Sequence, residues 1–363
     1  MLQSREAQAF FELLRAGLWQ RPPRDLGAFP LSALEWEAVF QLSRRQTVTG
    51  LVYQGMSALP VPLLPPSGLL VRWVAEVDAI ERSNRRMNRV LADCYATYVR
   101  QGLHPVLQKG QGVARYYDEP LQRVCGDIDL YFPNRDEARQ AAGMARRPGH
   151  AAHRMADGGV CCEWQGVEVE IHDRLLDVYN PFVRRELARL ETEEGWRSVR
   201  IAGEERLEVL IPSPILNLLL LNTHILKHAL GWGIGLRQFC DLARAYHCLS
   251  GEVDGKRLRR LLGRIGLRRW TRLLHAFLVE HLGLPPEELP YSERGTSSRT
   301  LLTIVLRGGN FGLYLSGRTA GQHAVWARKL RTSHTYIRNV GFACRYAPQE
   351  AFWIFMNLLK GQF

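Results

Sequence analysis

Apolar side chains recur at three- and four-residue steps through the first hundred positions, the period of an α-helix with one buried face. One apolar stripe consists of Phe10, Phe11, Leu13, Leu14 and Leu18, and a second of Trp36, Val39, Phe40 and Leu42. After a proline-rich stretch at 59–68, the same period continues from 69 to about 101 and predicts one long helix. We therefore expect a helical N-terminal region over residues 1–103.

The period changes after residue 103, where short apolar runs are separated by glycine-containing turns. The candidate strands are 104–108, 128–132, 150–155, 160–165 and 167–172. In the last of these, apolar and polar residues alternate strictly, as in a strand with one buried face. Asn134 is a suitable N-cap for a helix through about Ala145. The pattern predicts an α/β unit over residues 104–205.

From residue 206 to 363 the pattern is mostly helical again. Strongly apolar periodic runs cover 215–231 and 236–247, and a basic amphipathic segment covers 256–282. The basic residues of that segment are Lys256, Arg257, Arg259, Arg260, Arg264, Arg268, Arg269 and Arg272. They form either a solvated helix face or a surface that docks an anionic acceptor.

Composition limits the class of protein. The chain has 363 residues, 46% of them hydrophobic, and a formal net charge of +12, which favours anionic partners. Its seven cysteines follow no disulfide or metal-site spacing, so we expect reduced thiols in a cytoplasmic protein. The N-terminus lacks the continuous apolar stretch of a signal peptide, and prolines interrupt the most apolar run, so no membrane span is predicted.

The candidate chemistry begins with Asp127 and Asp129. In a strand, side chains at i and i+2 lie on the same face about 6.6–6.8 Å apart, so both carboxylates face the same way. Because such carboxylates repel each other unless a cation lies between them, the pattern suggests a divalent metal. Glu170, on the strand at 167–172, could supply a third carboxylate, and Glu168 shares its face.

These features resemble a known superfamily. A strand, a glycine turn at Lys109-Gly110, a short helix and then Asp127-Ile-Asp129 on the next strand is similar to the nucleotidyltransferase superfamily that includes polymerase β. The segment LQKGQGVARYYDEPLQRVCGDIDLYF resembles, more specifically, a group of bacterial nucleotidyltransferase family proteins. The remaining matches to that group are Val169-Glu170-Ile171-His172, His224, His228, Arg237 and Asp241.

The resemblance implies an α+β fold, with a polymerase-β-like core on a mixed sheet between helical N- and C-terminal regions. It also implies that Asp127, Asp129 and Glu170 are catalytic residues that hold Mg²⁺ or Mn²⁺, the cations suited to oxygen ligands. The residues expected to contact the nucleotide are Lys109, Gly110, Gly112, Arg123, His172, His224 and His228.

The histidine pair on the helix at 215–231 is open to three interpretations. His224 and His228 lie one helical turn apart, so they could contribute to a zinc site, form a hydrogen-bonded core pair or line the active cleft. Arg237 and Asp241 have the spacing of a helix-stabilising ion pair.

We expect a transferase that moves a nucleotide monophosphate from a nucleoside triphosphate, ATP among them, to a hydroxyl or phosphate of an anionic acceptor. That acceptor could be a peptide, a protein, RNA or a small molecule. The resemblance leaves two other reactions open: sugar transfer from a nucleotide-sugar to a phosphorylated ribosomal peptide, and toxin-like nucleotidylation of tRNA or protein. A non-enzymatic nucleic-acid binder is the last alternative.

Overall fold

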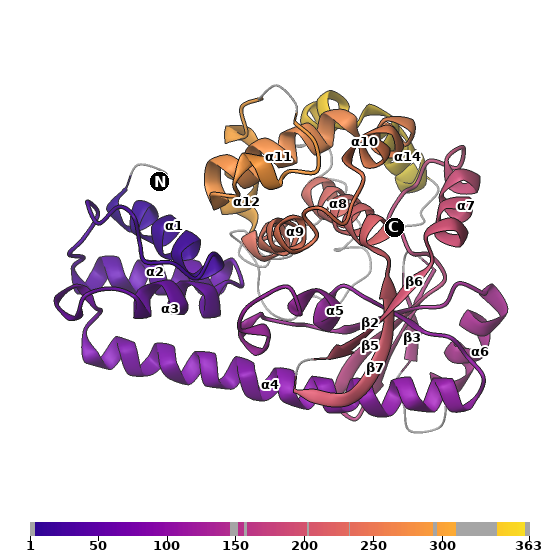
Figure 1. The fold of residues 1–363 in the computed structure, drawn as a ribbon, viewed down its shortest axis with the longest axis horizontal. Helices are drawn as coiled ribbons and strands as arrows, with labels where there is room; N and C mark the ends of the chain where they lie inside the picture. Colours follow the sequence, from indigo (N-terminus) through magenta and orange to yellow (C-terminus); the bar gives the residue numbers. More distant parts are fainter. Residues whose placement is uncertain are drawn as a thin grey trace.

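A mixed seven-stranded sheet lies between one long helix and a cap of shorter helices (Figure 1). The computed structural model describes residues 4–145, 152–155, 158–201, 203–231, 233–292, 296–309 and 340–359. This architecture confirms the predicted α+β class with a mixed sheet.

The helices are α1 (Arg5–Leu18), α2 (Ala33–Arg45), α3 (Thr49–Ser57), α4 (Ser67–Arg100), α5 (Gly110–Ala114), α6 (Arg135–Ala145), α7 (Arg184–Glu194), α8 (Pro214–Gly231), α9 (Leu236–Cys248), α10 (Gly255–Arg264), α11 (Arg268–Leu282), α12 (Arg299–Gly308) and α14 (Pro348–Leu359), with 3₁₀ turns at η1 (Val61–Leu63), η2 (Pro120–Gln122) and η3 (Pro286–Glu288). The strands are β1 (Val106–Gln108), β2 (Ile128–Tyr131), β3 (Ala152–Arg154), β4 (Val160–Trp164), β5 (Val167–His172), β6 (Trp196–Ile201) and β7 (Glu204–Pro212).

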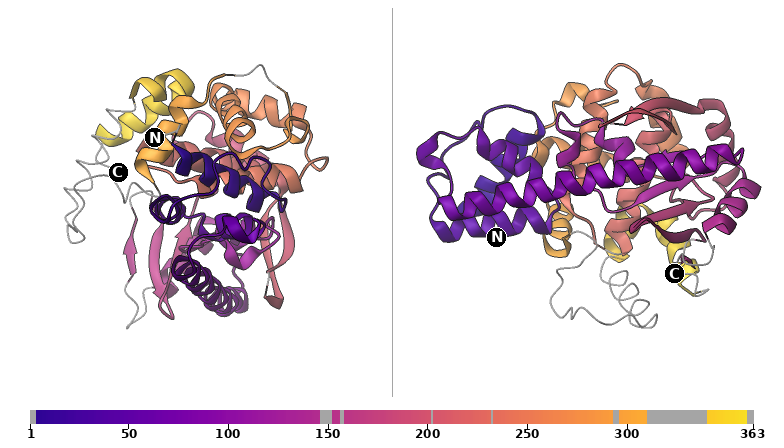
Figure 2. Two further views of the ribbon diagram at one scale, coloured as in Figure 1. Left: turned by 90° about the vertical axis from the view of Figure 1, so that its left-hand side faces the viewer. Right: turned by 90° about the horizontal axis from the view of Figure 1, so that it is seen from below.

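Helix α4 links the N-terminal helices to the sheet. Its 34 residues run from α1, α2 and α3 to the far side of the strands, along one side of the molecule (Figures 1 and 2). Trp73, near its start, packs in the core of the N-terminal helices, whereas Leu91 and Tyr98 pack in the core under the sheet. One continuous helix, as its apolar period predicted, therefore anchors both halves of the protein.

The strand order is β3-β4-β5-β2-β1-β7-β6. β2 is parallel to β5 and antiparallel to β1, and β1 is parallel to β7. The hairpin β6–β7 was not predicted as such: β7 continues to Pro212, past the boundary placed at residue 205, because its apolar positions pair with β1. Of the candidate strand at 150–155, residues 150 and 151 lie outside the described residues, and β3 forms from the remainder.

The two faces of the sheet differ. Leu107, Leu130 and Val169 belong to one face and pack with α4 and α6 in an apolar core. Asp129 and Glu170 alternate with them and so lie on the opposite face, which packs toward the helices that follow β7. This alternation places a polar site between the sheet and the helical cap.

Two further predictions can be compared with the structure. All seven cysteines are free. The basic segment at 256–282 forms two helices, α10 and α11, which are separated where Gly266 adopts a positive φ of 78°. None of the helices in the described residues combines the length and apolarity that crossing a bilayer requires.

Candidate active site

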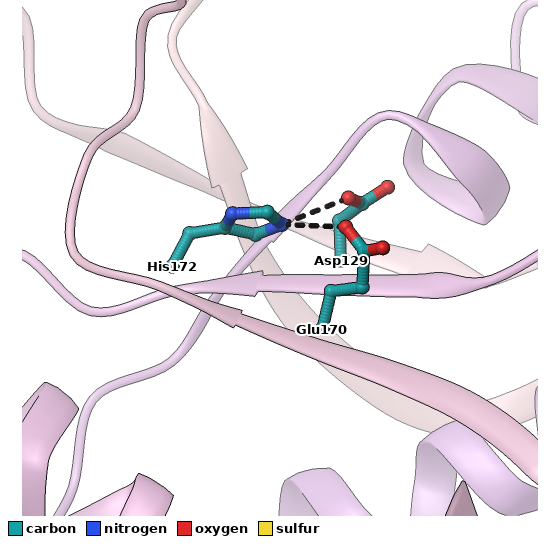
Figure 3. A group of neighbouring side chains, drawn as sticks. All are labelled: Asp129, Glu170 and His172. Carbon is teal, nitrogen blue, oxygen red and sulfur yellow. Dashed lines mark hydrogen bonds and ion pairs between the residues drawn. The ribbon is translucent and has the colours of Figure 1, made fainter. Parts of the chain in front are cut away.

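Asp129 and Glu170 meet at the centre of the sheet because β2 and β5 pair in parallel. They are direct register partners, so their side chains share one face of the sheet. His172, two residues further along β5, places its Nε2 3.0 Å from Asp129 Oδ1 and 3.2 Å from Glu170 Oε2 (Figure 3). The three side chains converge within a single hydrogen-bonded cluster.

The turn after β1 adds a cation to this cluster. Lys109 Nζ lies 3.0 Å from Asp129 Oδ1. The backbone of Lys109 has φ 38° and ψ −141°, a conformation that side-chain-bearing residues rarely adopt, and Gly110 follows with φ 42°. Such strain costs on the order of 1–3 kcal/mol and is concentrated at functional sites. The turn therefore holds an ammonium group against the carboxylates at an energetic cost.

The charged groups of the cluster shift one another's pKa values. Burial acts to raise the pKa of Asp129, but Lys109 and the hydrogen bond from His172 outweigh it and hold that pKa well below its usual range. Burial opposes the charge of His172, yet its hydrogen bonds to Asp129 and Glu170 raise the pKa of His172 to about 10. Burial, together with the charges of Asp129 and Glu170, raises the pKa of Asp127 to about 7. The cluster thus contains cationic His172 and Lys109 beside ionised Asp129.

The donor set fits a divalent cation. One ligand atom from each of Asp129, Glu170 and His172 lies within 4.8 Å of the other two, and no other three His, Cys, Asp or Glu side chains in the described ranges converge in this way. Two carboxylates are ordinary ligands of divalent metals, and so is an imidazole that has lost its proton, so a cation bound here would displace the proton of His172. Asp127, one residue before β2, is not one of these three, although it is close enough for the charges of Asp129 and Glu170 to raise its pKa. The sequence pattern predicts Asp127 as a ligand and His172 as a nucleotide contact.

Register also separates the two glutamates of β5. Glu170 lies opposite Asp129, whereas Glu168 lies opposite Glu163 of β4 and accepts a hydrogen bond from Cys161 Sγ at 3.2 Å. Although both glutamates share a face, the one that lies beside Asp129 is Glu170.

The loop between α5 and β2 is held by a buried ion pair. Arg123 donates from Nε and Nη2 to the two oxygens of Asp241, both at 2.7 Å, and Tyr117 Oη donates to Asp241 Oδ1 at 2.7 Å. Burial acts to raise the pKa of Asp241, but the Arg123 guanidinium outweighs it and holds the pKa below its ordinary value. Two predictions need correction. Asp241 pairs with Arg123 and not with Arg237, and the Arg123 guanidinium is committed to this pair, not exposed to a phosphate.

Arg237 instead reaches the same loop from the start of α9. Its Nη1 donates to the backbone carbonyl of Val124, and Asn84 Nδ2 donates to the carbonyls of Leu121 and Arg123 at 2.6 Å and 2.7 Å. Side chains from α4 and α9 therefore fix the path of the loop that leads into Asp127 and β2.

A second, half-buried polar group lies near Lys109. Asp177 binds Lys227 Nζ at 2.8 Å and His224 Nδ1 at 3.3 Å, and its charge also acts on Lys109. Burial and the nearby ammonium of Lys109 lower the pKa of His224 to about 4 despite the Asp177 carboxylate. Nothing in the sequence pattern identified Asp177 or Lys227, because they lie in a loop and on an apolar helix without a motif.

The histidine pair forms no metal site among the described residues. The rings of His224 and His228 pack edge to face with centroids 4.4 Å apart, and neither belongs to a cluster of three potential ligands. The zinc interpretation is therefore not supported, and His224 is part of a hydrogen-bonded wall beside Lys109.

Comparison with known proteins identifies the family. A family model described as an uncharacterised nucleotidyltransferase matches residues 32–283, well over half of the chain. The chain belongs to this nucleotidyltransferase family. No curated protein and no solved structure matches it.

The range matched by the nucleotidyltransferase family includes the whole site, from Lys109 to Asp241, and excludes α1, α12 and α14. The resemblance noted from the sequence is confirmed at this level. Within the matched range, Gly112 has a packing role: a Cβ there would lie 3.3 Å from Ile211 Cγ2 of β7. Gly110, with its positive φ, provides the close turn of the backbone below Lys109.

Proposed function

We propose that this protein is a metal-dependent nucleotidyltransferase, which moves a nucleotide monophosphate from a nucleoside triphosphate to a hydroxyl or phosphate of an acceptor. The observation that carries the proposal is the convergence of Asp129, Glu170 and His172 from two parallel strands. A member of a nucleotidyltransferase family needs such a site to accommodate the negative charge of a triphosphate.

Asp129, Glu170 and His172 would hold Mg²⁺ or Mn²⁺, with Asp127 as the next carboxylate at the entrance to β2. When bound, the cation supplies positive charge to the triphosphate and aligns the reacting oxygens. Lys109 compensates the charge of Asp129 through its 3.0 Å ion pair. Its ammonium and the Gly110 backbone would contact phosphate oxygens of the donor.

In the reaction, an acceptor oxygen forms a bond to the α-phosphorus while the bond from that phosphorus to the bridging oxygen breaks, and pyrophosphate leaves with the electron pair. The acceptor proton departs toward Glu170, whose side chain is 20% exposed, compared with 3% for Asp129. Asp129 is the interior ligand and Glu170 the one that an acceptor can reach. His224 forms the neighbouring wall of the site.

The test is transfer of label from α-³²P nucleoside triphosphates to acceptors in cell extract, with Mg²⁺ or Mn²⁺, and release of pyrophosphate. Asp129→Asn and Glu170→Gln should each lower turnover by at least about a hundredfold, the loss typical of removing a catalytic electrostatic group. Glu168→Gln is the matched control, since it changes the same strand and face away from the cluster, and it should retain activity within about threefold.

Equal losses in all three variants, or turnover that persists in Asp129→Asn while the protein remains folded, would overturn the proposal. A parallel reaction with nucleotide-sugars labelled in the sugar separates the two donor classes: label from the sugar on the acceptor would assign glycosyl transfer to the same site. The seven free cysteines support a reducing, cytoplasmic location.

A further inference from the structure

A basic groove lies between α7 and α10, and none of its lining residues belongs to the catalytic cluster. Its volume is about 490 Å³. Half of its ten lining residues are arginines: Arg185, Arg189, Arg257, Arg260 and Arg264. Helix α14 lies near α7 and α10 in the fold (Figure 1), and its Trp353 contacts the groove residue Phe182. The groove concentrates positive charge in a chain that already carries a net charge of +12.

Acidic neighbours neutralise only part of this charge. Arg264 pairs with Glu186 at 2.8 Å, and Arg257 pairs with Glu194 at 2.6 Å. Within the described ranges, the three remaining arginines (Arg185, Arg189 and Arg260) have no carboxylate within ion-pair distance. Three guanidinium groups are thus available to an anionic ligand.

Helix geometry aligns these charges along the groove. Arg257, Arg260 and Arg264 are spaced i, i+3 and i+7, so they share one face of α10, while Leu258 and Leu262 are buried on the other. Arg185 and Arg189 of α7 are spaced i and i+4, so they share one face of that helix, about 6 Å apart along its axis. Together with Arg260 of α10, they spread positive charge over more than one phosphate position of a strand.

An exposed aromatic ring stands at the groove. Phe182, which also lines it, is 82% exposed and is held edge-on against Trp353 of α14, with ring centroids 5.8 Å apart. Glu350 fixes α14 to the same loop, since it accepts hydrogen bonds from the backbone nitrogens of Tyr179 and Asn180 at 2.8 Å and 3.2 Å. The contacts of Trp353 and Glu350 thus hold the loop that carries Phe182, and the Phe182 ring is exposed to solvent beside the arginines of the groove.

We propose that this groove binds a single-stranded segment of nucleic acid, with its phosphates on Arg185, Arg189 and Arg260 and a base stacked on Phe182. Arginines that follow the backbone and an aromatic platform that accepts any base are the two elements of such binding. A phosphorylated peptide would use the arginines but has no base for the ring. The inference does not depend on the proposed transfer reaction, because the groove shares no residue with the cluster.

Binding is measured with the full-length protein and a fluorescein-labelled oligouridine of about 12 nucleotides, by anisotropy over a range of salt concentrations. The triple variant Arg185→Gln, Arg189→Gln, Arg260→Gln should bind at least about tenfold more weakly. Its plot of log affinity against log salt should flatten by about 2, since each lost phosphate contact contributes about 0.7. Phe182→Ala should lose about fivefold or more with an unchanged salt slope.

The control triple variant is Arg82→Gln, Arg139→Gln, Arg200→Gln, which removes the same charge from exposed arginines outside the groove. It should bind within about twofold of the wild type, and so should Asp129→Asn, which separates this inference from the catalytic one. No binding by the wild-type protein, or equal losses in both triple variants, would overturn the proposal. The proposal would also be overturned if binding of a phosphoserine peptide or of anionic vesicles depended on the groove arginines while binding of oligouridine did not.

Discussion

The buried pair of Arg123 and Asp241 offers the sharpest test of how the site is built. Asp241→Asn keeps the shape of the side chain but removes its charge. The guanidinium of Arg123 would then be buried without a counter-ion, with both of its 2.7 Å bonds weakened. The Tyr117 hydroxyl would keep an acceptor only if the new amide presents its oxygen to it.

The magnitude follows from burial. The side chains of Arg123 and Asp241 are 5% and 4% exposed, so solvent screens the pair little. Removing one partner of such a pair costs about 3–5 kcal/mol, a large part of the 5–15 kcal/mol by which folded proteins are ordinarily stable. Replacing both partners by apolar residues of similar volume, Arg123→Met with Asp241→Leu, should restore most of the loss, because no isolated charge remains buried.

The assay is urea unfolding followed by tryptophan fluorescence for the wild type, Asp241→Asn, the single variants Arg123→Met and Asp241→Leu, and the double variant that combines these last two. We expect a coupling free energy of at least about 2 kcal/mol between the two sites. Turnover should fall in Asp241→Asn because the loop leading to Asp127 loses an anchor. If Asp241→Asn costs less than about 1 kcal/mol, or if the single effects add without coupling, the pair does not hold the loop as argued.

Further predictions follow from individual contacts. The pKa of Asp241 is lower in the folded than in the unfolded state, so the ionised carboxylate stabilises the fold fully above its unfolded pKa near 4, and this contribution is lost as pH falls through the folded pKa. The difference in unfolding free energy between wild type and Asp241→Asn should therefore shrink below about pH 4, and a constant difference would contradict this. Gly112→Ala should lower the unfolding free energy by about 1 kcal/mol or more, since the new Cβ crowds Ile211 of β7. Gly143 in α6 has open space around it, so Gly143→Ala should raise the unfolding free energy by about 0.5–1 kcal/mol. Urea unfolding compares the two variants, and a change of the same sign in both would refute the packing argument. Of the seven thiols, Cys248 and Cys344 are exposed and should react promptly with a disulfide reagent in the native protein. The half-buried Cys125 should react more slowly, and the buried Cys94, Cys161, Cys162 and Cys240 only on unfolding; more than three thiols that react in the native protein would mean that the folded core opens readily.

Local pattern was sufficient for much of this protein. The apolar period predicted α4, the alternation in 167–172 predicted β5 and the N-cap predicted α6, because each depends on residues close in sequence. Asp129 and Glu170 were also identified, since their spacing and order matched a family motif and alternation placed each on a defined face. The hairpin β6–β7 carried an alternating signal too, at Val199 and Val209, but the apolar run into α8 obscured where the sheet ends.

What the sequence by itself determined is which residues are polar on which face of each element. Tertiary structure alone decided which of these polar residues meet. The parallel register of β2 and β5 set Glu170, and not Glu168, beside Asp129 and brought His172 into the cluster. The packing of α9 against the loop before β2 pairs Asp241 with Arg123, which is distant in sequence, and not with Arg237 of the same helix. Side-chain periodicity fixes directions within one element, whereas contacts between elements depend on register and packing that no local spacing encodes.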